Sequence, residues 1–121
     1  MMQPHIAIAL EQEPFTPTQC IAICDTAAID ALWRRSDQYL PAGCEAADGK
    51  LARAREYIAS CERLQVPSIF IDDHNDGGVY IRFAQGRHRF SAMREAGCET
   101  VPIGMTFATR RVAMMHGLVA G

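Results

Sequence analysis

The chain has 121 residues, of which 49% are hydrophobic and 21% charged, and its 12 basic and 14 acidic residues give a formal net charge of −2. This length predicts one domain, and the composition excludes a disordered tail, a collagen-like rod and a coiled coil. Because there is no overall positive charge, a non-specific nucleic-acid binder is also disfavoured. We therefore expect the function to depend on a local site.

The sequence predicts a cytoplasmic protein without membrane contact. No apolar run approaches the roughly 20 residues of a membrane span, and the first residues lack the basic and apolar regions of a secretory signal. The cysteines are odd in number and irregularly spaced, which indicates reduced thiols. Cys20 and Cys24 lie four residues apart, but two thiols cannot complete a tetrahedral zinc site. We predict no metal site there.

The first half of the chain is expected to form a strand and two amphipathic helices. Residues 6–10 are all apolar and predict a short strand. Thr26 is a suitable N-cap for a helix whose apolar residues recur at helical spacing until Pro41. Asp48 is a suitable cap for a second such helix, which extends to Gln65.

The second half of the chain predicts strands and helices separated by turn residues. The expected elements are a strand over 68–71, a turn over 72–78, a strand over 79–84, a helix over 87–96, a strand over 101–106 and a helix over 108–117. We therefore expect a single domain over 1–121. It comprises a strand and two helices in 1–65, a β-β-α-β core in 66–106 and a C-terminal helix in 107–118.

A strand, a glycine and then a basic helix start suggest an anion site, formed by Gly86, Arg87, His88 and Arg89. The first N–H groups of a helix lack partners within it and carry a partial positive charge. Gly86 allows a sharp turn and the close approach of a ligand. The alternative is a solvated first helical turn, although cations there are unfavourable by roughly 0.3–1 kcal/mol each. We predict that the four residues bind phosphate, with His88 as a phosphate ligand or a proton donor.

The distribution of charge supports this prediction. The segment from Gly77 to Arg94 contains four arginines and no acid, so it carries +4 and the remainder of the chain carries −6 to reach the total of −2. A locally basic helix start on an otherwise acidic protein favours a negatively charged ligand, most naturally a phosphate.

Residues 66–106 resemble the ParB/sulfiredoxin superfamily domain. The resemblance rests on the strand Ile69–Ile71, the turn Asp76-Gly77-Gly78, the box Gly86-Arg87-His88-Arg89, a helix with Ala92 and Gly97, and Thr100-Val101-Pro102-Ile103. It implies an α+β fold in which a small mixed β-sheet packs with helices, and a nucleotide-phosphate pocket at the helix start. Members of the superfamily bind ATP, ADP or CTP, and some are nucleases or ATPases of bacterial or plasmid origin.

The box also departs from the superfamily pattern at one position. Arg87 stands where sulfiredoxins have a cysteine and where partition ParB proteins have a glutamate. Without that thiol, sulfinic-acid repair is not expected. The chain also has no room for a helix-turn-helix domain, so a DNA-partition clamp is not expected.

Catalysis of phosphoryl transfer or phosphodiester hydrolysis would need a base or a metal in addition to phosphate ligands. Candidate acids that could hold Mg²⁺ beside phosphates are Asp72, Asp73, Asp76, Glu11 and Glu13. Among possible catalytic residues we select His88 and Asp73. The alternative for the aspartates is a solvated turn, because aspartate is a common turn residue.

Three hypotheses of function follow. The first is a domain that binds the phosphates of ATP, another nucleotide or a nucleic acid, with Mg²⁺ where it acts as an NTP hydrolase or nuclease. The second is a non-catalytic accessory protein that keeps the fold and binds DNA or an acidic protein partner, with Arg110 and Arg111 extending the basic surface or merely exposed. The third is a thiol redox protein that uses Cys20 and Cys24.

Overall fold

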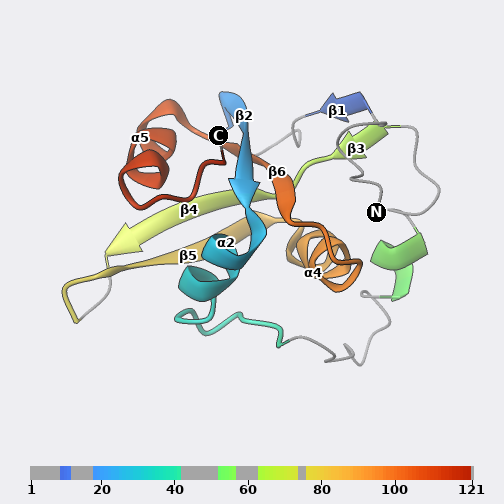
Figure 1. The fold of residues 1–121 in the computed structure, drawn as a ribbon, viewed down its shortest axis with the longest axis horizontal. Coiled ribbons are helices and arrows are strands. Elements are labelled where there is room, and N and C mark those ends of the chain that lie inside the picture. Colours follow the sequence, from blue (N-terminus) through green and yellow to red (C-terminus); the bar gives the residue numbers. More distant parts are fainter. Residues whose placement is uncertain (1–8, 12–17, 42–51, 57–62, 74–75, 121) are drawn as a thin grey trace.

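The computed structural model describes residues 9–11, 18–41, 52–56, 63–73 and 76–120 (Figure 1). Residues 52–56 are helical. The other elements, in chain order, are β1 (Ala9–Glu11), β2 (Cys20–Asp25), α2 (Thr26–Trp33), β3 (Arg63–Gln65), β4 (Ser68–Asp73), β5 (Val79–Gln85), α4 (Arg87–Glu95), β6 (Thr100–Met105) and α5 (Phe107–Met115).

The main sheet has four strands in the order β2-β6-β4-β5. β2 pairs antiparallel with β6, β4 pairs antiparallel with β5, and β4 runs parallel to β6. A separate two-stranded parallel sheet joins β1 to β3. Residues 101–105 of β6 are all buried, as expected for an apolar strand with a neighbour on each side. The molecule is thus an α+β protein with a small mixed sheet, as the resemblance of residues 66–106 implies.

An aromatic cluster joins α2, β5 and α4. The ring of Trp33 meets those of Phe83 and Phe90 edge-on, with centroids 4.8 Å and 5.6 Å away. Trp33 and Phe90 are fully buried, and large buried aromatic side chains contribute strongly to core stability. In Figure 1, α2 and α4 lie below the β4–β5 hairpin, whereas α5 lies above β4. The cluster therefore fixes the start of α4 relative to β5.

The outer edge of β5 is covered by the segment that follows α2. The side chain of Gln38 accepts a hydrogen bond from the N–H of Phe83 and donates one to its carbonyl oxygen. Arg35 donates to the carbonyl oxygen of Val79 at 3.0 Å. Exposed edge strands invite pairing with other chains, and these side chains occupy backbone groups that would otherwise be available. They also bring Gln38 next to the end of β5.

The structure corrects the sequence-based prediction at α2. Asp25, not Thr26, is the N-cap, and its carboxylate accepts a hydrogen bond from the N–H of Ala28 at 3.0 Å. The helix ends at Trp33 rather than near Pro41. Residues Cys20–Asp25 form β2, a strand that the sequence analysis did not predict. Because β2 runs directly into α2, no turn residues mark the boundary.

Two further predictions need correction. The second helix does not reach Gln65, because Arg63–Gln65 form β3, while residues 52–56 are helical and most of the remainder lies outside the described residues. Arg55 of this helical segment makes a bidentate ion pair with Glu95 of α4, at 2.6 Å and 2.9 Å. The pair lowers the pKa of the Glu95 carboxyl through hydrogen bonding. In addition, the predicted turn over 72–78 is shorter, because β4 continues through Asp73.

Candidate functional site at the start of α4

Gly86 forms the junction between β5 and α4. Its φ is +83° and its ψ 22°, in the left-handed region, and its carbonyl oxygen accepts the first intrahelical hydrogen bond from the N–H of Phe90 at 2.9 Å. A Cβ at this position would lie 2.9 Å from the Cα of Pro67. Both the dihedral angle and the close backbone approach therefore require glycine. No side chain caps this helix.

A pocket of about 250 Å³ opens at this junction. It is lined by Gln38, Phe83, Ala84, Gln85, Gly86, Arg87 and His88. Three of the four residues of the predicted phosphate-binding box, Gly86 to His88, therefore share one hollow. The first amides of α4 adjoin it, and helix geometry gives those amides no carbonyl partner within the helix. The pocket is smaller than the roughly 300–1,000 Å³ of sites that enclose a whole ligand, so it suits a phosphate group rather than an entire nucleotide.

Arg87 is held at the side of this pocket. Its Nη1 donates a hydrogen bond to the carbonyl oxygen of Gln38 at 3.2 Å, and the residue is half-buried. A guanidinium has five N–H donors in a planar fork. The contact with Gln38 uses one of them and orients the group. Arg87 is thus a pre-positioned cation at the helix start.

Arg89 lies on the other side of Gly86. Its Nη1 donates to the carbonyl oxygen of Gln65 at 2.7 Å, and its guanidinium reaches within 3.0 Å of the place where a Cβ on Gly86 would lie. It is not among the residues that line the pocket. The contact ties α4 to β3, which pairs with β1 at Glu11. The structure therefore gives Arg89 a bridging position and leaves Arg87 and His88 at the pocket.

Asp73 is remote from this pocket. It pairs with Val79 at one end of the β4–β5 hairpin, whereas Gln85 pairs with Ser68 at the other end. Five strand positions separate Ser68 from Asp73, which corresponds to about 17 Å. The structure does not bring Asp73 and His88 together.

The other candidate acids also lie apart from the pocket or outside the described residues. Asp72 faces Arg82 of the neighbouring strand at 3.8 Å, and both side chains are about half exposed. Asp76 pairs with Arg35 and accepts a hydrogen bond from the N–H of Gly78, so it closes the hairpin turn. Glu11 belongs to β1, and Glu13 lies outside the described residues. The seven lining residues named above include no carboxylate.

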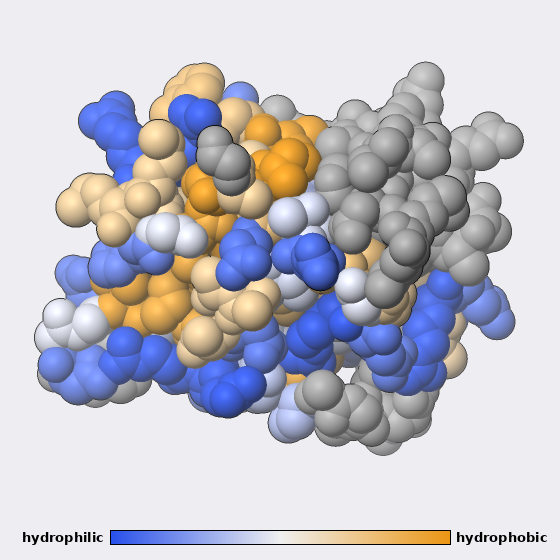
Figure 2. Space-filling view, viewed as in Figure 1, coloured by the Kyte–Doolittle hydropathy of each residue, from blue (hydrophilic) through white to orange (hydrophobic). Residues whose placement is uncertain are grey.

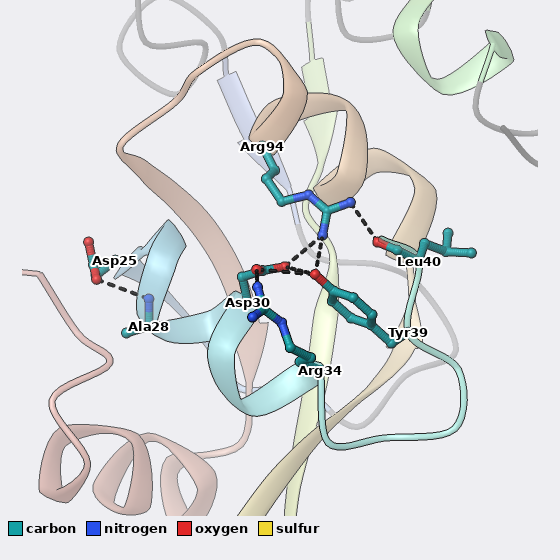
Figure 3. A network of polar contacts seen from close by, with 7 residues as sticks. All are labelled: Asp25, Ala28, Asp30, Arg34, Tyr39, Leu40 and Arg94. Carbon is teal, nitrogen blue, oxygen red and sulfur yellow. Dashed lines mark hydrogen bonds and ion pairs between the residues drawn. The ribbon is translucent and has the colours of Figure 1, made fainter. Parts of the chain in front are cut away.

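A polar network accounts for part of the charge that the sequence appeared to leave unbalanced. Arg94 of α4 donates to the carboxylate of Asp30 at 2.6 Å and to the carbonyl oxygen of Leu40, also at 2.6 Å, while Tyr39 donates to Asp30 at 3.0 Å (Figure 3). Of the four arginines between Gly77 and Arg94, Arg82 and Arg94 thus have acidic partners. Counting residues along the segment therefore overstates the positive charge that is left for a ligand.

A second and larger pocket, of about 450 Å³, lies at the start of α2. Its lining includes three acids, Asp25, Asp30 and Glu99, together with Arg94. The sequence analysis did not identify it, because these residues are distant in the chain. Its negative balance makes it a poor phosphate site, since carboxylates repel an anion. The smaller pocket at α4 is therefore the candidate site.

Cys20 and Cys24 are not arranged as a reactive pair. Both lie on β2, where four strand positions correspond to a separation of about 13 Å. Burial raises the pKa of the Cys24 thiol to about 12, and burial also raises the pKa of Cys98. Because the thiolate is the reactive form, burial makes both thiols less reactive than an exposed cysteine. Within the described part of the chain, no group of three or more His, Cys, Asp or Glu residues is placed to hold a metal ion.

This arrangement predicts the pattern of cysteine alkylation. In the native protein at pH 8, iodoacetamide is expected to modify half-buried Cys20 much faster than Cys24 and Cys98, since both of these are buried and burial raises the pKa of each thiol. Peptide mass spectrometry measures each site, and unfolding in urea should make all of them reactive. Rapid native alkylation of Cys24 would contradict the assignment.

Comparison with known proteins yields one informative match. No protein-family model matches the chain, and no curated protein matches it. Among solved structures, the chain superposes on the Oncogenic Suppression Activity Protein, a plasmid fertility inhibition factor crystallised as a gold(I) cyanide derivative, with a TM-score of 0.72 and 14% sequence identity. The two share a ParB/sulfiredoxin-like fold. The match covers 84% of this chain but only 57% of the other.

The likeness is one of fold alone, because the sequences are so different. It agrees with the expectation of a ParB/sulfiredoxin-like fold. None of the helices in the described ranges is long and apolar enough to cross a membrane.

Proposed function

We propose that this protein binds a phosphate group of a nucleotide or a nucleic acid in the pocket at the start of α4. The observation that carries the proposal is the junction itself: Gly86, held at φ +83°, opens a helix beside a pocket that Arg87 and His88 line. A helix start with its partial positive charge, a fixed guanidinium and an imidazole are the groups that bind phosphate in proteins. The superfamily resemblance of residues 66–106 supports the same ligand class.

Binding is better supported than hydrolysis. The lining supplies positive groups that could stabilise phosphoryl oxygens, and His88 could transfer a proton. However, the seven described lining residues include no carboxylate for Mg²⁺, and Asp73 lies at the far end of the hairpin. An ATPase or nuclease reaction would therefore need an acid from outside the lining.

The alternative function is that of a non-catalytic accessory protein that uses the fold to engage DNA or an acidic partner. The expected cytoplasmic location remains a prediction.

The test is a thermal-shift series with inorganic phosphate, ADP, ATP, CTP and a short single-stranded oligonucleotide, each with and without Mg²⁺. A ligand at one hundred times its Kd stabilises the folded state by about 2.7 kcal/mol, which raises the Tm of a domain of this size by roughly 10 °C. Isothermal titration then gives the Kd. Absence of any shift with every one of these ligands would overturn the proposal.

A substitution at Arg87 identifies the site. Arg87→Gln is expected to weaken phosphate binding about tenfold or more, because a charge-assisted hydrogen bond contributes about 1.5–3 kcal/mol. Arg82→Gln is the matched control, since it removes one positive charge from the adjoining strand at a residue that faces Asp72 instead of the pocket. Equal weakening by both variants would indicate a non-specific effect of charge. Calorimetry at two salt concentrations distinguishes the two cases, because screening affects remote charges most.

A further inference from the structure

The outward face of α5 carries large apolar side chains. Phe107 and Met114 are just over half exposed and Met115 is 82% exposed. Among the described residues, only Phe70 of β4 joins them as an exposed large hydrophobic side chain, and α5 packs against β4. Contiguous exposed apolar surface is uncommon on a soluble protein and commonly marks an interaction site.

Helix geometry shows that this face is not the one used for the core. Ala113 is buried and Thr109 and Val112 are half-buried, so these residues define the inner side of α5. Phe107 and Met114 are seven residues apart, which at about 3.6 residues per turn places them on one stripe opposite to the inner side. An ordinary surface helix would carry polar residues there. The apolar stripe therefore has no role in the described fold.

Two arginines flank the apolar stripe. Arg110 and Arg111 are exposed and lie on either side of the line from Phe107 to Met114. No ion pair of either guanidinium occurs within the described ranges, and α5 itself contains no acid. We call the surface formed by Phe107, Arg110, Arg111, Met114 and Met115 the α5 face. It combines apolar anchors with unbalanced positive charge.

The α5 face is held in place before any partner arrives. Thr106 caps the helix by accepting a hydrogen bond from the N–H of Thr109 at 3.1 Å, and the N–H of Phe107 donates to the side chain of Gln19 at 3.0 Å. A rigid surface loses little conformational entropy on binding. Methionine and arginine are both enriched at protein interfaces. The flexible methionine side chain can also adapt its shape to a partner.

We propose that the α5 face docks an acidic amphipathic helix of another protein. Leucine-like side chains of such a helix would cover the apolar stripe, and its carboxylates would pair with Arg110 and Arg111. A second copy related by two-fold symmetry would instead place these arginines against each other. A nucleic-acid backbone would satisfy the charges but leave Phe107 and the methionines uncovered. The chemistry of the face thus selects an acidic and partly apolar partner.

This surface is separate from the phosphate pocket. In Figure 1, α5 and α4 lie on different sides of the β4–β5 hairpin. In the same view, Figure 2 shows moderately hydrophobic and strongly hydrophilic atoms side by side over the region of α5, at the upper left. A partner on the α5 face would leave the start of α4 accessible. The proposal therefore does not depend on phosphate binding.

The test is selection from a random peptide library displayed on phage, with peptides of about 15 residues, enough for four helical turns. The folded protein serves as bait, and Phe107→Ser/Met114→Ser serves for counter-selection. Enriched peptides are expected to carry net negative charge, with apolar residues three or four positions apart. The best peptide is then synthesised and its Kd is measured by fluorescence anisotropy.

Variants of the α5 face test whether the selected peptide binds there. Phe107→Ser/Met114→Ser and, separately, Arg110→Gln/Arg111→Gln are each expected to weaken binding of the selected peptide at least tenfold. Arg34→Gln/Arg53→Gln, which removes the same charge from exposed positions on other elements, should leave it unchanged. Circular dichroism confirms that each variant is folded. Enrichment of basic peptides, no enrichment, competition by duplex DNA for the selected peptide, or a dimer that dissociates on Phe107→Ser/Met114→Ser would each overturn the proposal.

Discussion

Replacing Arg94 with alanine is expected to lower the free energy of unfolding by about 3–5 kcal/mol, because it leaves a buried carboxylate without its principal partner. The side chains of Arg94 and Asp30 are only 12% and 15% exposed, and their ion pair measures 2.6 Å. Arg94 also donates to the carbonyl oxygen of Leu40, and its guanidinium lies 5.6 Å from the ring centroids of both Trp33 and Tyr39. One substitution therefore removes the ion pair with α2 and the hydrogen bond to the segment after it that Arg94 supplies from α4 (Figure 3).

Urea denaturation of four proteins measures this effect: the wild type, Arg94→Ala, Asp30→Ala and the double variant. These four proteins form a double-mutant cycle. Its coupling energy measures the interaction between Arg94 and Asp30 separately from the packing contacts that each substitution removes. Arg34→Ala is the control, since Arg34 also binds Asp30, at 3.1 Å, but its side chain is 67% exposed and water screens the interaction. We expect a much smaller loss in that variant. If Arg94→Ala and Arg34→Ala were equally mild, the buried pair would not stabilise the fold.

The C-terminal half of the fold was predictable because its signals are local. Apolar strands bounded by turn residues predicted β4 and β5, and Gly86 and Gly97 marked the ends of α4 at nearly the observed positions. The residues at the ends of each of these elements determine where it begins and ends. Predicted and observed boundaries agree in this part of the chain because glycine and turn residues at those positions favour particular backbone conformations.

The N-terminal half was less predictable because its structure depends on distant partners. β3 comprises only Arg63–Gln65 and exists by pairing with β1, more than fifty residues earlier. β2 pairs with β6, whose residues lie near the other end of the chain. No local sequence pattern predicts such pairings. The spacing of the apolar residues in this region favoured helices instead. Tertiary contacts here outweigh local propensity.

The charge argument for the site was predictable only in part, for the same reason. Counting residues gave four unbalanced arginines, but the acid that pairs with Arg94 is Asp30, sixty-four residues away. Arg87 and His88 do border a pocket, whereas Arg89 is directed to the carbonyl oxygen of Gln65. Sequence identifies the residue types that suit a phosphate. Only the fold determines which of them face one another.

Gly86→Ala is expected to destabilise the protein by about 2–5 kcal/mol. A residue with a Cβ pays roughly 1–2 kcal/mol to adopt the left-handed conformation that Gly86 has at φ +83°. The added Cβ would also lie 2.9 Å from the Cα of Pro67, which is backbone and cannot rotate away. Relieving such an overlap costs about 1–3 kcal/mol more. Urea denaturation measures the total.

Gly77→Ala separates the two contributions. Gly77 also has a positive φ, of 90°, but a Cβ there would meet nothing within 4 Å. The free energy of unfolding of Gly77→Ala should therefore fall only by the cost of the left-handed conformation, about 1–2 kcal/mol. The excess loss in Gly86→Ala then measures how closely β5 and α4 are held against Pro67. Equal losses in the two variants would mean that the junction relaxes freely.

The same two variants test whether this junction is the phosphate site. Moving the start of α4 by the few tenths of an ångström needed to relieve the Pro67 overlap would displace its first amides and Arg87 together. Phosphate binding should therefore fall at least tenfold in Gly86→Ala and remain unchanged in Gly77→Ala, when both are measured below their unfolding temperatures. If Gly86→Ala is folded and still binds with wild-type affinity, the ligand does not rest on the start of α4. In that case the exposed α5 face would be the better guide to what this protein does.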